Sequence, residues 1–151
     1  MLKGAKIMAV VAVIGCGRIS DIAHFPALSQ MENVRIKYAC DLLIEKAEEK
    51  KAKYPKIEQV ITDYKVALAD EEVDAVFVLT PNYAHYTITM DALKAGKHVL
   101  CEKPITVNYA LSLEMAQEAE KQGKNAQYRR MQPLSKIGGN VARMGGCGQV
   151  W

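Results

Sequence analysis

The chain has 151 residues, of which 50% are hydrophobic and 25% are charged, and its formal net charge is +3 at pH 7. This length allows one domain with a proper core, and the composition is that of a soluble globular protein. The mild charge, with Lys and Arg mixed among Glu, argues against a dedicated nucleic-acid surface, and no apolar stretch is long enough to span a membrane.

The first expected element is a buried strand that runs into a glycine turn. Seven apolar residues, Met8 to Ile14, form an unbroken run that is typical of a strand buried on both faces of a parallel sheet. The sequence Gly15-Cys16-Gly17-Arg18-Ile19-Ser20 follows. Its first glycine allows a tight turn, and its second allows the backbone to approach a pyrophosphate. Ser20 replaces the third glycine of the GxGxxG pattern, and its small size preserves close helix–strand packing.

A helix is expected from Arg18 to about Gln30, with its free N–H groups and positive dipole end facing the phosphate. Pro26 should kink this helix or mark its first turn. His24 is interpreted as a packing or surface residue.

The N-terminus has a rival interpretation as an export signal. Two lysines precede the apolar run, and residues 13–16 resemble a lipoprotein cleavage box. The same residues continue into a strand–turn–helix pattern that is repeated downstream, which favours the strand and a cytoplasmic location.

The second expected strand, Val34 to Cys40, ends at an acidic residue. Asp41 lies about 20 residues after the glycine turn, where dinucleotide-binding folds hold the adenosine ribose. A carboxylate accepts two hydroxyl hydrogen bonds and repels a 2′-phosphate, so Asp41 favours NAD over NADP. A helix N-cap is the alternative role for Asp41, and both roles are compatible.

The alternation of strands and helices continues along the chain. Further strands are expected at 60–61, 74–80, 97–101 and 125–128, and further helices at 42–53, 62–70, 82–95 and 107–122. This order predicts an α/β fold with a doubly wound parallel sheet, in which ligands bind at the carboxyl ends of the strands. The residues expected at that edge are Gly15 to Gly17, Asp41, Thr80-Pro81-Asn82 and Glu102-Lys103-Pro104.

The four cysteines are far apart in the sequence and form no CxxC pair: Cys16, Cys40, Cys101 and Cys147. Three of them lie in or beside expected buried strands, where a thiol acts as a small hydrophobe. Reduced cysteines in a cytoplasmic protein are therefore expected, rather than disulfides or a metal site.

Together these features resemble the Gfo/Idh/MocA oxidoreductases, the glucose–fructose oxidoreductase and inositol dehydrogenase type. The matching stretches are VIGCGRIS (13–20), ACD (39–41), TPNYAH (80–85), GKHVLCEKP (96–104) and, more loosely, YRR (128–130). The resemblance implies a Rossmann domain that binds NAD(P), and hydride exchange with a sugar, polyol or similar secondary alcohol. Methyltransferase-like Rossmann proteins also have a GxG turn, but the EKP run has no role in them.

The resemblance also implies roles for individual residues. Lys103 would act at the reacting centre, bonding the substrate oxygen and steadying charge there; an ion pair with Glu102 or a surface position is the alternative. His85 would flank the cofactor or be packed inside its helix. The cofactor-binding set implied is Gly15, Cys16, Gly17, Arg18, Ile19, Asp41, Thr80, Pro81, Asn82, His85 and Glu102, and no metal is implied.

The end of the chain departs from the family pattern. Residues 1–130 are expected to form the dinucleotide-binding domain, and residues 131–151 a glycine-rich tail that begins a second α/β domain, which is absent or truncated. The family's proton-transfer groups usually come from beyond the nucleotide domain, and here no Asp follows Asp91 and no His follows His98.

Two functions follow from this pattern. The chain is either the cofactor-binding half of an oxidoreductase that turns over slowly on its own, or a standalone NAD-binding regulatory module. A nucleotide domain without its companion would expose apolar surface and tend to form homo-oligomers.

Overall fold

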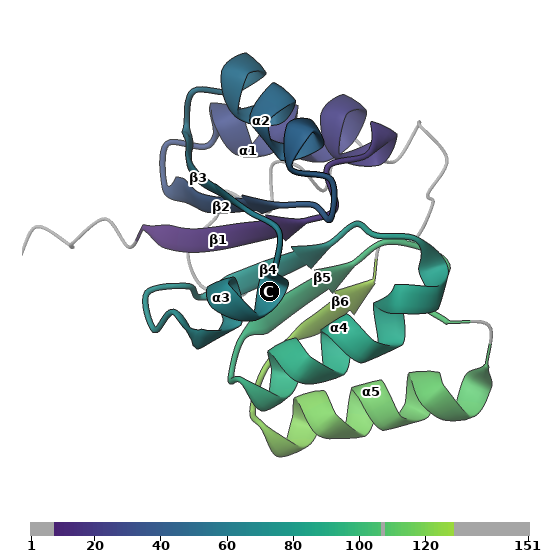
Figure 1. Cartoon of the computed structure of the whole chain (residues 1–151). Coiled ribbons are helices and arrows are strands. Elements are labelled where there is room, and N and C mark those ends of the chain that lie inside the picture. The colour runs from purple at the N-terminus through teal and green to yellow at the C-terminus, as the bar shows by residue number, and fades with distance from the viewer. Residues whose placement is uncertain (1–7, 107, 129–151) are drawn as a thin grey trace, which may run out of the picture.

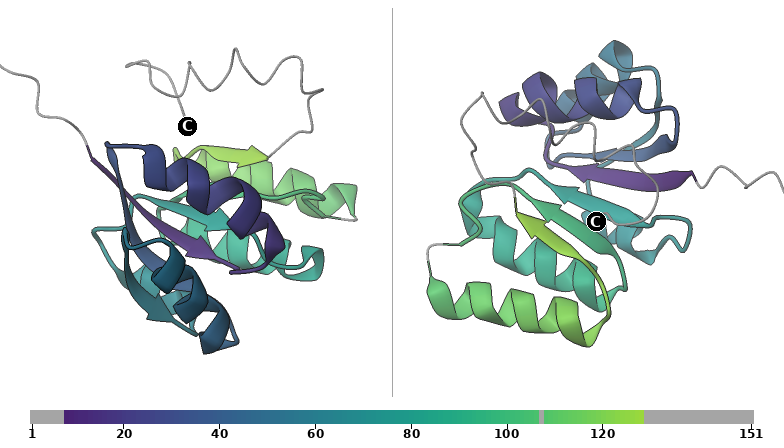
Figure 2. Two further views of the ribbon diagram at one scale, coloured as in Figure 1. Left: turned by 90° about the horizontal axis from the view of Figure 1, so that it is seen from above. Right: turned by 180° about the vertical axis from the view of Figure 1, so that it is seen from behind.

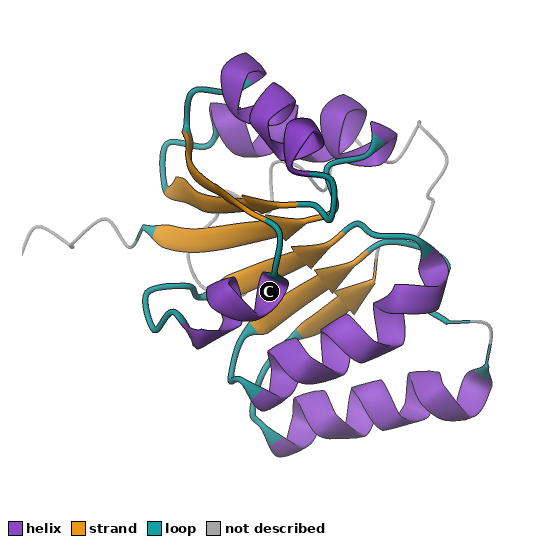
Figure 3. Cartoon of the chain, in the orientation of Figure 1, coloured by secondary structure: helices purple, strands orange, loops and turns teal. Residues whose placement is uncertain are grey.

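The computed structural model describes residues 8–106 and 108–128. Its centre is a six-stranded sheet in the order β3-β2-β1-β4-β5-β6, and every neighbouring pair of strands is parallel (Figure 1). Helices cover both faces of this sheet, as Figure 3 shows. The doubly wound α/β fold expected from the alternation of elements is therefore confirmed.

The element bounds agree closely with the sequence patterns. The strands are β1 (Ala9–Ile14), β2 (Val34–Cys40), β3 (Ile57–Ile61), β4 (Ala75–Val78), β5 (His98–Cys101) and β6 (Ala126–Tyr128). The helices are η1 (Ser20–His24), α1 (Phe25–Gln30), α2 (Ile44–Lys53), α3 (Tyr64–Ala69), α4 (Asn82–Lys94) and α5 (Tyr109–Lys121). The tail at 131–151, Cys147 included, lies outside the described residues.

The order of the strands creates a switch point between β1 and β4. The chain moves outward from β1 to β2 and β3, returns to pair β4 with β1, and then moves outward the other way to β5 and β6. The two further views in Figure 2 show the strands running in one direction, so their carboxyl ends share one edge. A crevice at such a reversal is where doubly wound folds bind ligands.

Two apolar clusters form the core, one on each face of the sheet. The first joins β1 and β4 to α3, α4 and α5 through residues such as Val76, Ile88 and Leu93. The second joins the same strands to α1 and α2 through Val11, Phe25 and others. Strands β1 and β4 are buried on both faces, which explains why their sequences are unbroken apolar runs.

The helix after the first strand contains an irregular turn just before its proline. Residues Ser20–His24 form a π-helical segment, in which the Phe25 N–H donates to the Ser20 carbonyl, and Pro26 lies in the first turn of α1. Proline has no N–H to donate and crowds the preceding turn, so an irregularity is expected beside it. Here the irregularity is the wider π-helical turn at Ser20–His24, and the helix continues into α1 without a break.

The end of one helix matches its sequence signal, and one strand is longer than expected. Gly96 has φ +74° directly after the Ala95 C-cap of α4, as expected for a C′ glycine. Strand β3 begins at Ile57 rather than Val60, and its additional residues Glu58 and Gln59 lie exposed on the edge strand of the sheet, where polar side chains remain in contact with solvent. No helix in the described part of the chain has the length and apolar character needed to cross a membrane.

Candidate functional site

The turn after β1 depends on glycine at position 15. Gly15 has φ +102°, and a Cβ atom built on it would lie 2.7 Å from both the carbonyl carbon and the oxygen of Leu79. Its N–H donates to the Cys40 carbonyl over 2.8 Å. The turn is thus pressed against the backbone that follows β4 and bonded to the end of β2.

Neither backbone strain nor a steric clash among the described residues accounts for glycine at position 17, in contrast to Gly15. The φ of Gly17 is not in the left-handed region, and a Cβ atom there would meet no described atom within 4 Å. Packing among the described residues therefore does not require a glycine at this position, whereas a ligand lying against the backbone would. Nearby, the Ser20 hydroxyl donates to the Gly17 carbonyl over 2.6 Å and closes the start of the helix.

The remaining residues of the turn differ in exposure. Cys16 is 2% exposed and its thiol lies 3.6 Å from the Cys40 carbonyl. Arg18 is exposed and Ile19 is partly buried, and both lie in the first helical turn before η1. The turn thus presents backbone and one cationic side chain outward while its cysteine faces the core.

Asp41 joins the end of β2 to the glycine turn. Its Oδ2 accepts the Cys16 N–H over 2.9 Å, and its Oδ1 accepts the Leu43 N–H over 3.0 Å. The side chain is only partly buried. Because a carboxylate offers about four lone-pair sites, two acceptor positions remain once these two bonds from the described residues are counted.

The loop after β4 lies at the same edge of the sheet. Thr80 is partly buried, and its Oγ1 is a buried atom without a hydrogen-bond partner among the described residues. Pro81 is the N-cap of α4 and Asn82 its first residue, and both are exposed. A buried hydroxyl without a partner is costly unless something else satisfies it, and this one lies beside the turn that Gly15 forms.

His85 holds this loop to the one after β5. The imidazole is 1% exposed, with Nε2 2.7 Å from the Thr80 carbonyl oxygen and Nδ1 2.8 Å from that of Pro104. Each ring nitrogen therefore lies within hydrogen-bonding distance of a backbone carbonyl.

The EKP run follows β5 and separates a buried acid from an exposed base. Glu102 is 5% exposed; its Oε1 lies 2.7 Å from His24 Nε2, and its Oε2 accepts the Lys103 N–H over 3.1 Å. The Lys103 side chain is exposed. Glu102 thus bonds a histidine on the helix after β1, and sequence reasoning missed this pair because the two residues are 78 positions apart.

The thiols beside the site are shielded from reaction. Burial raises the pKa of Cys16 and of Cys40 to about 12, with the charge of Asp41 adding to the effect. Burial likewise raises the pKa of Cys101 to about 11. All three are free and buried, so they serve as apolar core residues at neutral pH.

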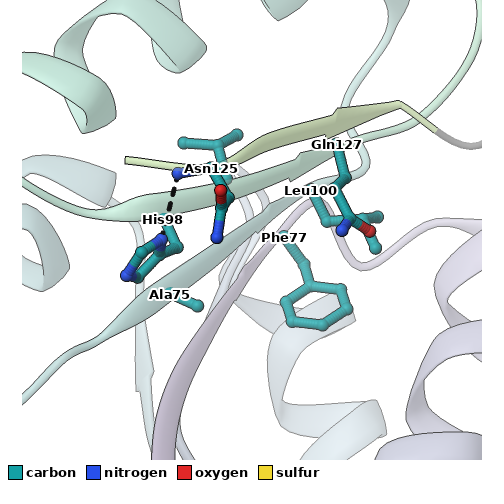
Figure 4. Close-up of a pocket in the computed structure, with 7 residues that line it drawn as sticks. Ala75, Phe77, His98, Leu100, Asn125 and Gln127 are labelled. Carbon is teal, nitrogen blue, oxygen red and sulfur yellow. Dashed lines mark hydrogen bonds between the residues drawn. The ribbon is translucent and has the colours of Figure 1, made fainter. Parts of the chain in front are cut away.

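A small pocket lies elsewhere on the sheet, away from the carboxyl ends of the strands. Figure 4 shows the residues that line it, which come from β4, β5, β6 and the residue just before β6: Ala75, Phe77, His98, Val99, Leu100, Asn125 and Gln127. None of these belongs to the edge described above. In the part of the chain that the structure describes, no three His, Cys, Asp or Glu side chains gather in a way that could hold a metal.

Comparison with known proteins gives a family and a set of relatives. The Gfo/Idh/MocA oxidoreductase family, described as having an NAD-binding Rossmann fold, matches residues 9–129. The chain is 34% identical over 118 residues to D-glucoside 3-dehydrogenase from Escherichia coli, covering 78% of this chain and 33% of that protein. It is 35% identical over 114 residues to inositol 2-dehydrogenase from Rhodococcus jostii, covering 76% of this chain and 31% of that protein.

Solved structures give the same result. The 3-ketoreductase KijD10 from Actinomadura kijaniata, in complex with NADP and TDP-benzene, superposes with a TM-score of 0.78 at 26% identity, covering 91% of this chain and 43% of that one. An NAD binding oxidoreductase from Klebsiella pneumoniae superposes with a TM-score of 0.74 at 32% identity, covering 82% and 34%.

The chain spans about a third of the length of the curated relatives that it matches. The matched region nevertheless covers every described strand and helix. The chain therefore belongs to the Gfo/Idh/MocA oxidoreductase family, and the part described here is its NAD-binding Rossmann fold.

Proposed function

We propose that this chain is the cofactor-binding part of an NAD-dependent oxidoreductase that exchanges a hydride with a sugar, polyol or related secondary alcohol. The observation that carries the proposal is the open space over Gly17, beside a turn whose shape Gly15 and Asp41 fix. The relatives named for glucoside and inositol dehydrogenation support the substrate class.

The residues at the edge fit a dinucleotide. The Gly15 and Cys16 N–H groups already donate to Cys40 and Asp41 and give the turn its shape. The Gly17 backbone and the first helical turn from Arg18 and Ile19 would therefore direct N–H groups and the helix dipole toward a diphosphate there. The Thr80 hydroxyl, which has no hydrogen-bond partner among the described residues, and the exposed Asn82 that follows Pro81 at the start of α4 would offer further polar contacts on the nicotinamide side.

Asp41 would hold the adenosine ribose. Its remaining lone pairs accept the two ribose hydroxyls, while its negative charge disfavours the 2′-phosphate of NADP. The two backbone bonds it already accepts hold the carboxylate beside the turn, so the group does not have to be ordered when the cofactor binds.

Lys103 is the proposed catalytic residue. When bound, a nicotinamide cofactor supplies the hydride acceptor or donor. The exposed ammonium at the end of β5 would bond the alcohol oxygen of the substrate and stabilise negative charge that develops on it. Glu102 and His85 are proposed to act by holding the loops around the cofactor, given their burial and their bonds to other parts of the chain.

Calorimetric titration of the 151-residue chain with NADH tests the proposal, run beside a screen of polyols and sugars as oxidisable substrates. Binding with slow or no turnover is expected, because the sequence offers no Asp after Asp91 and no His after His98 to accept the hydroxyl proton. Absence of NADH binding would overturn the cofactor assignment. Rapid turnover by the chain alone would overturn its assignment as the cofactor-binding part.

A further inference from the structure

Lys103 is flanked by two residues that are each bonded to a buried histidine. Glu102 precedes it and lies 2.7 Å from His24, and Pro104 follows it with its carbonyl 2.8 Å from His85. We propose that His24 and His85 are positioning residues that fix the backbone of Lys103 at the edge of the sheet. The importance of Lys103 rests on the proposed function, whereas the support given to its backbone does not.

The His24 side of this support is a continuous chain of contacts. The His24 ring packs edge-on against Phe77, with 5.8 Å between ring centroids and 76° between their planes, which sets the direction of its nitrogens. Nε2 bonds Glu102 Oε1, and the other carboxyl oxygen accepts the Lys103 N–H over 3.1 Å. His24 is 8% exposed and Glu102 is 5% exposed, so breaking the bond between them removes a hydrogen bond from two buried polar groups and carries a cost.

The His85 side reaches the same loop from the other face of the sheet. His85 lies on α4, which packs in the apolar cluster of Ile88 and Leu93, whereas His24 precedes α1 and contacts Phe77 of the opposite cluster. The two ring nitrogens of His85 face the Thr80 and Pro104 carbonyl oxygens at 2.7 and 2.8 Å, and the single N–H of a neutral imidazole donates to one of them, according to the tautomer. Because both partners are backbone atoms, His85 constrains the path of the chain directly.

These contacts connect the turn after β1 to the proposed catalytic residue. His24 ends the π-helical segment that begins three residues after Gly17. If this segment moves when a dinucleotide binds, the His24 and Glu102 side chains would transmit the displacement to the Lys103 amide. A packing role for His24 predicts no such connection.

Amide exchange measured by NMR on the full 151-residue chain, without cofactor, tests the His24 side. The variant His24→Phe keeps a ring against Phe77 but cannot bond Glu102. We expect the Lys103 amide to exchange about tenfold faster, the loss of roughly one hydrogen bond. Tyr54→Phe is the matched control, because it removes hydrogen bonds to Asp21 in the same helical segment and does not touch Glu102.

A second measurement tests the His85 side. In His85→Phe, the ¹³C signal of the Thr80 or of the Pro104 carbonyl is expected to move, because whichever oxygen accepts the imidazole N–H loses its donor. Tyr86→Phe is the control on the same helix; it removes a hydrogen bond to Glu114 and should leave both carbonyl signals in place.

Several results would overturn the proposal. One is a folded His24→Phe chain whose Lys103 amide exchanges at the wild-type rate. Another is a folded His85→Phe chain in which neither the Thr80 nor the Pro104 carbonyl signal moves. If either variant fails to fold, the wild-type chain decides: a Lys103 amide that exchanges as fast as in an unstructured peptide is incompatible with a fixed backbone.

Addition of NADH separates positioning from simple stabilisation. In the wild-type chain NADH should slow exchange of the Lys103 amide, whereas in His24→Phe it should bind with an affinity within about threefold of wild type and leave that amide unchanged. An equal response in both chains would refute the connection. Failure of NADH to bind at all would refute the proposed function instead, and the cofactor-free measurements would still decide the positioning roles.

Discussion

The backbone N–H of Cys16 donates to the Asp41 carboxylate over 2.9 Å, so the residue that ends β2 is bonded to the turn that ends β1. A second bond, from the Leu43 N–H, fixes the other carboxylate oxygen. The first bond thereby holds the end of β2 beside the turn after β1, although the two are separated in the sequence.

Replacing Asp41 with Ala should weaken NADH binding by about 10- to 100-fold, because a charged acceptor of two hydroxyl groups is lost. Calorimetry measures the change. Asp63→Ala is the matched control, since Asp63 also follows a strand and accepts a backbone N–H at a helix start, yet it caps α3 instead of contacting the glycine turn. That variant should lose stability but keep its affinity for NADH. Equal affinity of the Asp41 variant and wild type would remove the ribose assignment.

Alanine at the two glycines of the turn should affect different properties: stability at Gly15 and NADH affinity at Gly17. Gly15→Ala should lower the free energy of unfolding by at least about 2 kcal/mol, because φ is +102° and the new Cβ meets the Leu79 backbone. Gly17→Ala should change it by less than about 1 kcal/mol, while NADH affinity falls at least tenfold. Urea denaturation and calorimetry on both variants separate the two effects. A Gly17→Ala chain that binds NADH normally would show that no ligand lies against that backbone.

Cofactor preference should depend on the charge of Asp41. The wild-type chain is expected to bind NADH about tenfold more tightly than NADPH, because the carboxylate repels a 2′-phosphate. In Asp41→Asn, which keeps an oxygen acceptor and loses the charge, the ratio should fall toward one. Competition titrations at fixed ionic strength measure it. Stronger binding of NADPH by the wild-type chain would contradict this account.

Stability should fall in alkaline solution because three thiols are buried. Folding raises the pKa of Cys16 and Cys40 from 9.0 to about 12, so the native state holds their protons more tightly than the unfolded state. This contribution is complete below pH 9 and is lost as the pH rises toward 12. Urea denaturation from pH 7 to 11 should show the decline, with a shallower slope in Cys40→Ala. Val76→Ala, a core truncation without a thiol, should lower stability at every pH and keep the wild-type slope.

The sequence predicts most of the fold because the local signals agree with one another. Val34 to Cys40 forms a strand over the expected residues, and Gly96 ends α4 where its sequence places a C′ glycine. The start of β3 was missed because Glu58 and Gln59 look polar when their position at the sheet edge is unknown.

The site was predicted less completely than the fold. The gathering of Asp41 and the glycine turn follows from strand order alone, which a pattern of alternating strands and helices implies. The partner of Glu102 does not. The sequence indicates a packing or surface position for His24. Its bond to Glu102 depends on a wide turn beside Pro26 and on a contact between residues 78 positions apart, and no short sequence motif encodes either feature.

The close approach of Gly15 to the Leu79 and Thr80 backbone has a consequence for the evolution of this chain. The atoms that exclude a Cβ are main-chain atoms, which are the same whatever amino acids occupy positions 79 and 80. A second-site suppressor that merely shrinks a neighbouring side chain therefore cannot rescue a lost glycine at position 15. A screen of all single substitutions in a Gly15→Ala background should find no second substitution that restores stability. Homologues in which the rest of the loop varies should still have glycine at this position.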